Sequence, residues 1–163
     1  DALNLMASRV AQPAHNHILT PHPGEAARLL ACDVAEIEED RIGAAGRISQ
    51  MFGGVVLLKG AGTVVAGGGA MPDIVSGSNP GMATGGMGDV LSGVLGSLYA
   101  QLGDARAAAS AGAALHLAAA DLASETRGYM GLLPMDVIEA LSQVLVDSER
   151  RPDRRSVGVG GDE

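Results

Sequence analysis

The residues best suited to chemistry lie in a glycine-rich stretch, residues 78–89, that ends in a carboxylate. It reads Ser-Asn-Pro-Gly-Met-Ala-Thr-Gly-Gly-Met-Gly-Asp, and an apolar run of helical length follows it. Glycines let backbone N–H groups approach an anion, and the start of a helix adds the positive end of its dipole. A carboxylate repels phosphate, so Asp89 is poorly suited to phosphate binding alone. Its presence indicates that it removes a proton from a hydroxyl that attacks the phosphate. The alternative is a glycine-rich turn in which Asp89 only stabilises the first helical turn.

Two common phosphate-binding patterns do not fit this loop. A P-loop has Lys followed by Ser or Thr directly after its last glycine, and here Asp89 occupies that place. The dinucleotide fingerprint G-x-G-x-x-G also fails, because its last position, counted from Gly86 and Gly88, is Leu91. A dinucleotide-dependent oxidoreductase is therefore disfavoured.

The only lysine, Lys59, comes directly after the continuous apolar run 55–58. Such a run predicts a strand covered on both faces, and strand ends in α/β sheets face the ligand crevice. A cation there favours binding of a nucleotide phosphate, and Thr63 offers a hydroxyl to the same ligand. The alternative is a strand-end lysine that reaches solvent.

A third candidate segment, residues 20–25, lies where a predicted strand passes into a helix. His22 stands between Pro21 and Pro23, which restrict its backbone and suggest a defined role. Glu25 falls in the first helical turn, where its negative charge either interacts favourably with the helix dipole or holds Mg²⁺ through water. Further along, His116 lies in an alanine-rich segment and is interpreted as a packed core histidine.

Predicted strands and helices alternate around these residues. Strands are expected at 17–20, 55–58, 63–66 and 73–76, and helices at 1–7, 23–30, 40–52, 89–101, 104–125 and 134–148. This alternation indicates a layered α/β fold. The charged, glycine-rich residues 149–163 are interpreted as a mobile tail after a domain that covers residues 1–148.

Composition excludes several classes of partner. The net charge of -8 and an aromatic content of 2% argue against nucleic-acid binding, which needs basic surface and stacking platforms. The apolar stretches are all shorter than the ~18 residues of a membrane span. The single cysteine rules out an internal disulfide and favours a reducing, cytoplasmic location.

Three motifs together resemble the ADP/ATP-dependent NAD(P)H-hydrate dehydratases of the ribokinase-like superfamily. They are residues 20–30 (TPHPGEAARLL), 56–65 (VLLKGAGTVV) and 79–93 (NPGMATGGMGDVLSG). Residues 1–5 and 131–138 also resemble flanking family segments, so the likeness spans about residues 1 to 145. It implies a three-layer α/β/α fold with a mostly parallel central sheet.

The resemblance implies repair of hydrated NADH or NADPH. The family phosphorylates the hydroxyl left by hydration, and phosphate then departs as the nicotinamide double bond re-forms. Bacterial members generally use ADP and eukaryotic ones ATP, with Mg²⁺. Carried over by position, Asp89 is the catalytic carboxylate, His22 and Asp89 contact the hydrate, and Glu25 is the metal candidate. The implied nucleotide and phosphate contacts are Lys59, Gly60, Ala61, Gly62, Thr63, Thr84, Gly85, Gly86, Met87 and Gly88.

Family members carry a sizeable stretch of the same domain before the segment that resembles residues 1–5. We therefore expect the chain to be the carboxy-terminal portion of this domain, with an epimerase domain fused upstream in some relatives. A homo-oligomer is also expected. Two rival interpretations stay open: a ribokinase-like kinase that phosphorylates a vitamin precursor's hydroxymethyl group, and an inactive nucleotide-binding fragment.

Overall fold

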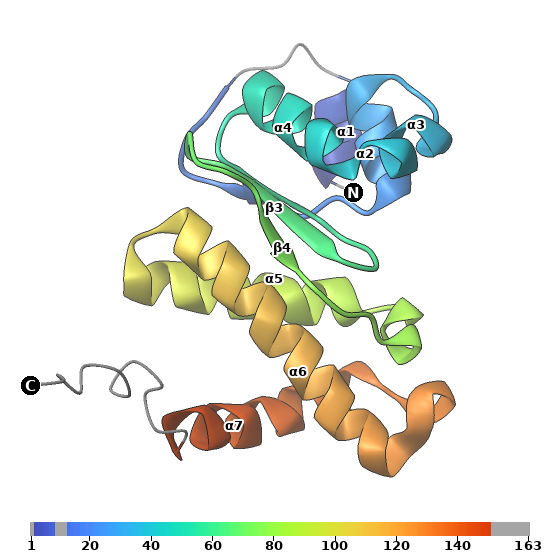
Figure 1. Ribbon diagram of the computed structural model, residues 1–163, viewed down its shortest axis with the longest axis vertical. Helices are drawn as coiled ribbons and strands as arrows, with labels where there is room; N and C mark the ends of the chain where they lie inside the picture. Colours follow the sequence, from blue (N-terminus) through green and yellow to red (C-terminus); the bar gives the residue numbers. More distant parts are fainter. Residues whose placement is uncertain (1, 9–12, 151–163) are drawn as a thin grey trace, which may run out of the picture.

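A computed structural model of the chain describes residues 2–8 and 13–150. Strands and helices alternate along the first half, and helices follow in the second (Figure 1). The strands are β1 (Ile18–Leu19), β2 (Val55–Leu58), β3 (Thr63–Gly67) and β4 (Asp73–Val75). The helices are α1 (Ala2–Ala7), α2 (Pro23–Leu30), α3 (Val34–Glu39), α4 (Arg41–Phe52), the 3-10 turn η1 (Pro80–Ala83), α5 (Met87–Leu102), α6 (Ala105–Gly131) and α7 (Pro134–Arg150).

The four strands form one sheet in the order β1-β2-β3-β4. β1 and β2 are parallel, with Ile18 opposite Val55, and the helices α2 to α4 connect them. β2 pairs antiparallel with β3, and β3 antiparallel with β4, because short turns join them and a parallel connection needs a longer crossover. The layered α/β fold is confirmed. The expected mostly parallel character is not confirmed, since one of the three described pairings is parallel.

Helices cover both faces of the sheet, as the apolar run 55–58 predicts. Val56 and Leu58 pack in one core with α2 and α4, whereas Val55 and Leu57 pack in a second core with α5 and α6. The two layers of helices lie on either side of the strands in Figure 1. Side chains alternate between the two faces of a strand, so a continuous apolar strand supplies both cores. Within the described residues, every helix lacks the length or the apolarity that a membrane crossing needs.

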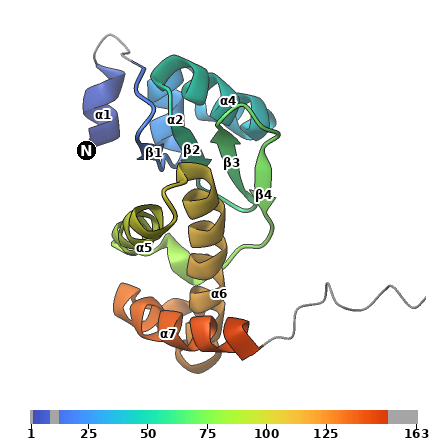
Figure 2. The ribbon, with the colours of Figure 1, turned by 90° about the vertical axis from the view of Figure 1, so that its left-hand side faces the viewer.

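A third apolar core joins the carboxy-terminal helices to the start of α5. It includes Met87 of α5, Leu132 between α6 and α7, Val137 in the first turn of α7, and alanines of α6. The helix α6 runs to Gly131, past the predicted end near residue 125, and its helical backbone is interrupted at Gly128, with φ 67°. Figure 2 shows α6 reaching from the sheet to α7. The predicted mobile tail falls largely on residues 151–163, which lie outside the described residues.

Candidate active site

The glycine-rich loop ends at the first turn of α5, as the sequence predicts, although α5 begins at Met87 and not at Asp89. Among the described residues, the N–H groups of Gly85, Gly86 and Gly88 meet no protein acceptor. The 16-residue helix directs the positive end of its dipole toward the same place. Free N–H groups and this dipole together make a site for an anion such as phosphate.

Gly86 is the residue that lets the loop turn into α5. Its φ of 92° lies in the left-handed region, which side chains other than glycine rarely adopt. A Cβ at this position would also lie 3.0 Å from Cγ of Pro134, the first residue of α7. The start of α5 is therefore shaped by its own backbone and by the start of α7.

The ammonium of Lys59 lies at the beginning of α5. Lys59 follows the end of β2, and its Nζ is 3.5 Å from the point that a Cβ on Gly88 would occupy. It is also 3.9 Å from Oε2 of Glu25. A cation thus stands beside the free N–H groups, and Gly88 leaves the space between them open. The interpretation of Lys59 as a phosphate ligand therefore fits the geometry better than a lysine directed only to solvent.

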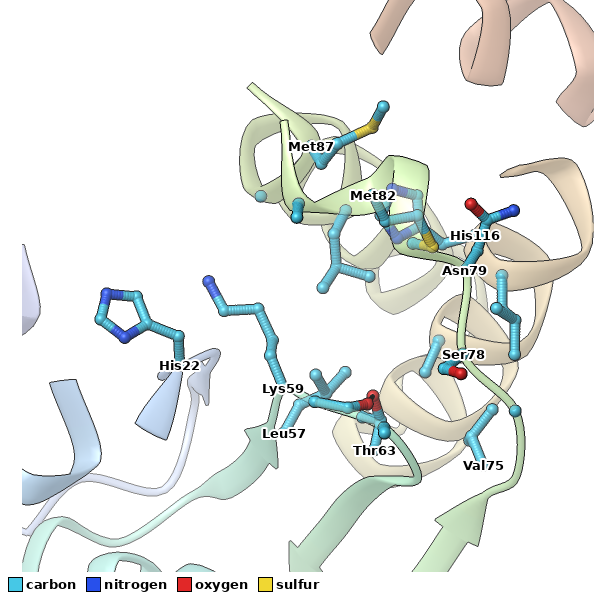
Figure 3. A pocket seen from close by; sticks show the side chains of 18 of the residues that line it. His22, Leu57, Lys59, Thr63, Val75, Ser78, Asn79, Met82, Met87 and His116 are labelled. Carbon is cyan, nitrogen blue, oxygen red and sulfur yellow. Dashed lines mark hydrogen bonds between the residues drawn. The ribbon is translucent and has the colours of Figure 1, made fainter. Parts of the chain in front are cut away.

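A cavity of about 610 Å³ opens between the sheet, the loop and α6. This volume lies in the range of ordinary small-molecule sites. Figure 3 shows Lys59 reaching into this space from β2, with His22 on one side and Ser78 and Asn79 on the other. Of the predicted site residues, the cavity brings together His22, Lys59, Gly60, Ala61, Thr63, Thr84, Gly85, Gly86, Met87 and Gly88. Gly62 does not line it.

Asp89 lines a second hollow that adjoins the first at Gly86. Its volume is about 760 Å³, and its walls are largely apolar side chains of α5 and α7 such as Val94, Ile138 and Leu141. The start of α5 therefore lies between two spaces, one with Lys59 and one with the Asp89 carboxylate. The sequence places both residues near one anion site, and the structure adds that they face different hollows.

His22 and Glu25 form the reciprocal cap of α2. The backbone N–H of His22 donates to Oε2 of Glu25 at 2.7 Å, and the N–H of Glu25 donates to Nδ1 of His22 at 3.3 Å. The helix-stabilising role of Glu25 is thus present in the structure. The described residues contain no group of three metal-ligating side chains. Glu25 alone does not build a magnesium site, and its role toward a metal stays a prediction.

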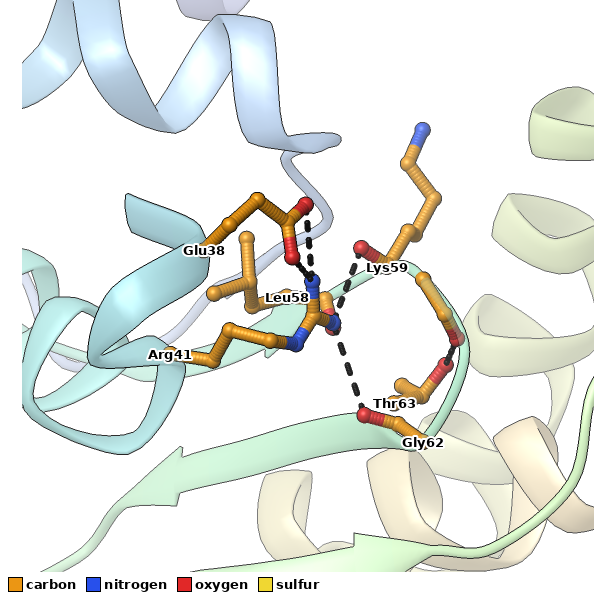
Figure 4. A network of polar contacts seen from close by, with 7 residues as sticks. Glu38, Arg41, Leu58, Lys59, Gly62 and Thr63 are labelled. Atoms are coloured by element: carbon orange, nitrogen blue, oxygen red, sulfur yellow. Dashed lines mark hydrogen bonds and ion pairs between the residues drawn. The ribbon is translucent and has the colours of Figure 1, made fainter. Parts of the chain in front are cut away.

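Arg41 is a residue of the site that sequence reasoning did not find. Its guanidinium donates to the carbonyl oxygens of Leu58, Lys59 and Gly62 at 3.3, 3.2 and 3.4 Å, and it pairs with Glu38 at 3.1 Å (Figure 4). These carbonyls belong to the turn between β2 and β3. Arg41 therefore holds that turn, and with it the backbone of Lys59, from outside the cavity.

Asn79 is a second residue whose structural role the sequence did not predict. It is buried, its Oδ1 accepts from the N–H of Gly81 at 2.9 Å, and its Nδ2 donates to Asp121 at 2.9 Å and to Ser124 at 3.0 Å. Both partners of the amide nitrogen lie on α6. Asn79 therefore fastens the glycine loop to α6, which is the opposite wall of the cavity.

These features define a ribokinase-like α/β protein: helices on both faces of a small sheet, and a glycine loop that opens a helix beside a strand-end lysine. A solved ribokinase-like superfamily protein from Enterococcus faecalis is 26% identical, with a TM-score of 0.75, and the match covers 90% of this chain and 50% of that one. Residues 1–143 match the model of the NAD(P)H-hydrate dehydratase family. The chain belongs to this family, which confirms the resemblance seen in its motifs.

Relatives with described activities agree with this assignment. The bifunctional NAD(P)H-hydrate repair enzyme Nnr of Escherichia coli K12 is 51% identical over 148 residues, 89% of this chain and 28% of that protein. The ADP-dependent (S)-NAD(P)H-hydrate dehydratase of Neisseria meningitidis is 44% identical, over 86% of this chain and 49% of its own length. A solved ADP/ATP-dependent NAD(P)H-hydrate dehydratase from Bacillus subtilis, co-crystallised with ATP and Mg²⁺, has a TM-score of 0.76 at 28% identity, covering 85% of this chain and 52% of that one. The chain thus spans about a quarter to a half of the length of these relatives.

Proposed function

We propose that the protein dehydrates (S)-NAD(P)H hydrate to NAD(P)H, using ADP or ATP to phosphorylate the hydrate's hydroxyl. The observation that carries this proposal is the start of α5, where the free N–H groups of Gly85, Gly86 and Gly88 adjoin the Lys59 ammonium. The family match and the activities named for the relatives in Neisseria and Bacillus support the choice of substrate and co-substrate.

The nucleotide occupies the cavity beside Lys59, with its terminal phosphate at the start of α5. The N–H groups and the ammonium stabilise negative charge that develops on the phosphate oxygens during transfer. The hydrate enters from the hollow that Asp89 lines, so that its hydroxyl approaches the phosphorus from the side opposite the leaving nucleotide. In-line transfer requires this arrangement, in which attacking and leaving oxygens lie on opposite sides of the phosphorus.

Asp89 accepts the proton of the hydrate's hydroxyl as its oxygen bonds to phosphorus and the bond between phosphorus and the nucleotide oxygen breaks. Inorganic phosphate is then a good leaving group. The C–O bond breaks with both electrons passing to phosphate, the neighbouring carbon loses a proton, and the nicotinamide double bond re-forms. The water added by hydration thus leaves as part of the phosphate.

Magnesium enters this scheme as the counter-ion of the nucleotide's phosphates, which supply most of its ligands in sites of this kind. Glu25 is the carboxylate nearest to Lys59 that could reach such an ion through water. His22 lines the cavity beside Lys59, so its assigned contact with the hydrate requires the hydrate to extend past the start of α5 into that cavity. Both assignments remain predictions. Fusion to an epimerase and assembly into a homo-oligomer also remain predictions, although the relative in Escherichia coli is named as bifunctional.

The test is an assay of the full-length protein with (S)-NADPH hydrate and ADP or ATP. Recovery of the NADPH absorbance that depends on the nucleotide and yields inorganic phosphate is the expected result. Samples without nucleotide and with the (R) epimer are the controls. A stable phosphorylated product from a hydroxymethyl substrate, with no NADPH formed, would instead identify a vitamin-precursor kinase. Nucleotide binding without turnover of either substrate would identify a binding protein.

A further inference from the structure

The segment in which α6 passes into α7, residues 127–134, touches the glycine loop at two glycines, and we call this segment the elbow. A Cβ on Gly81 would lie only 2.8 Å from the carbonyl oxygen of Tyr129. A Cβ on Gly86 would lie 3.0 Å from Cγ of Pro134. Neither position has room for a side chain, so the loop lies directly against the elbow at both points.

Both contacts bear on the candidate active site. The carbonyl oxygen of Gly81 accepts from Oγ1 of Thr84 at 3.0 Å, and Thr84 lines the cavity beside the sheet. Gly86 lines that cavity and also the second hollow, which contains Asp89. Pro134 forms part of the wall of the second hollow. The position of the elbow therefore determines where the glycine loop stands between the two spaces.

The carboxylate of Asp136 ties the two ends of the elbow together. Its Oδ1 pairs with Nε of Arg127 at 2.8 Å, and its Oδ2 accepts from the backbone N–H of Leu133 at 2.9 Å. The side chain of Asp136, the third residue of α7, is only 11% exposed. Because the helical backbone of α6 is interrupted at Gly128, one residue after Arg127, a continuous helix does not fix the rest of the elbow. The two contacts of Asp136 supply that constraint from the side of α7.

We infer that Asp136 is a positioning residue: by closing the elbow it holds Gly81 and Gly86, and thereby aims the N–H groups at the start of α5 toward the phosphate. Asp136 itself lines neither the cavity nor the second hollow. The inference deepens the proposed function, and its effect on turnover rests on that function. Donors that stabilise a transition state act through their orientation, so a displacement of about 1 Å is enough to slow the transfer strongly.

The experiment compares wild-type full-length protein with Asp136→Ala in three measurements. They are Tm, the Kd of pyrophosphate by titration calorimetry as a probe of the start of α5, and NADPH formation at saturating ADP or ATP well below Tm. We expect Asp136→Ala to bind pyrophosphate about tenfold more weakly and to turn over about tenfold more slowly per folded molecule. Asp136→Asn keeps one acceptor oxygen and should retain part of both properties.

Asp104→Ala is the matched control, because Asp104 also caps the start of a helix. Its Oδ1 accepts from the N–H groups of Arg106 and Ala107 at 2.8 and 3.0 Å, and the residue lines neither the cavity nor the second hollow. Loss of this cap should lower Tm as the loss of Asp136 does. Pyrophosphate affinity and turnover should stay at their wild-type values.

An Asp136→Ala protein that matches Asp104→Ala in pyrophosphate affinity and turnover would overturn the inference and leave the proposed function intact, since Asp136 would then only stabilise α7. Wild-type protein that forms no NADPH would refute the proposed function. Weaker pyrophosphate binding in Asp136→Ala would still support the positioning of the anion site in that case. If Asp136→Ala does not fold, Asp136→Asn decides alone, because its amide presents an NH₂ group where Arg127 needs an acceptor. Pyrophosphate affinity equal to that of wild type would then overturn the inference.

Discussion

The guanidinium of Arg41 donates to the carbonyl oxygen of Gly62 at 3.4 Å, although the two residues are 21 positions apart in the chain. The same nitrogen lies 3.2 Å from the carbonyl oxygen of Lys59. Arg41 is at the first turn of α4, its side chain is only 15% exposed, and Glu38 orients it from the other side. One buried guanidinium therefore fixes both ends of the turn that carries the predicted nucleotide contacts 59–63.

Replacing Arg41 by lysine should weaken nucleotide binding more than it slows phosphate transfer. A lysine ammonium has no planar fork of donors and does not reach three carbonyls at once, so the turn gains freedom. We expect KM for ADP or ATP to rise about tenfold and kcat at saturation to change by less than about threefold. Steady-state kinetics of the full-length protein check this split.

Arg47→Lys is the matched control for that measurement. Arg47 lies on the same helix, but its side chain is 50% exposed and pairs with Asp40 at 3.8 Å. Exposed pairs of this kind contribute little to stability. If the two variants show the same KM and kcat, Arg41 has no special role in positioning the turn.

Asp89→Asn should retain nucleotide binding and lose turnover by about 10²-fold or more, because an amide does not accept the hydroxyl proton. Binding should persist since Asp89 faces the second hollow and not the cavity that contains Lys59. Calorimetric Kd for ADP and single-turnover rates are the two measurements. Asp147→Asn, on the exposed part of α7, serves as control. Near-normal turnover combined with weaker ADP binding would assign Asp89 to the stability of the helix start.

Substitutions in the glycine loop should separate stability from binding. Gly88 has helical backbone, and a methyl group there meets only the end of Lys59 at 3.5 Å, an ordinary contact. Gly88→Ala should therefore leave Tm unchanged or slightly raised, since alanine favours the helix by up to about 1 kcal/mol. The methyl group occupies the space through which phosphate approaches the N–H, so ADP affinity should fall about tenfold.

Two other alanine substitutions calibrate this result. Gly96→Ala lies on the same helix with nothing within 4 Å of the added methyl group, and it should change neither Tm nor affinity. Gly86→Ala meets Pro134 at 3.0 Å on a backbone with φ 92°, and it should lower Tm markedly. Unaltered ADP binding in Gly88→Ala would remove the start of α5 from the phosphate site.

Local sequence predicted most of the elements and the glycine loop because the relevant signals are local. The apolar run 55–58, the prolines around His22 and the glycines before Asp89 each specify backbone geometry within a few residues. Arg41 and Asn79 escaped prediction because their partners lie 17 to 21 and 42 to 45 positions away. Arg41 follows three acidic residues in the sequence, and such a pattern predicts only a solvent-exposed helix surface. The antiparallel direction of the β2–β3 and β3–β4 pairings follows from the short turns between the predicted strands 55–58, 63–66 and 73–76. The mostly parallel sheet was implied by the family resemblance alone.

The stability of the protein should depend on pH through His116. Its pKa in the folded protein is lowered from 6.5 by burial and then by the charge of Lys59. Below about pH 6.5 the unfolded chain therefore binds a proton that the folded protein does not. The free energy of unfolding consequently decreases as the pH is lowered in that range. The stability that comes from keeping His116 neutral is fully present above pH 6.5. It is lost as the pH falls through the pKa of His116 in the folded protein.

His116→Leu should abolish this part of the pH dependence. Because the other titratable groups are common to both proteins, the difference in unfolding free energy between variant and wild type isolates His116. We expect that difference to be constant from pH 7 to 8 and to shift in favour of the variant as pH falls from about 6.5 toward 5. Denaturant titrations at each pH measure it, with His15→Leu as the exposed control. Parallel curves for wild type and His116→Leu across this range would mean that the imidazole takes up its proton equally well in the folded protein, and that Lys59 and burial do not keep it neutral.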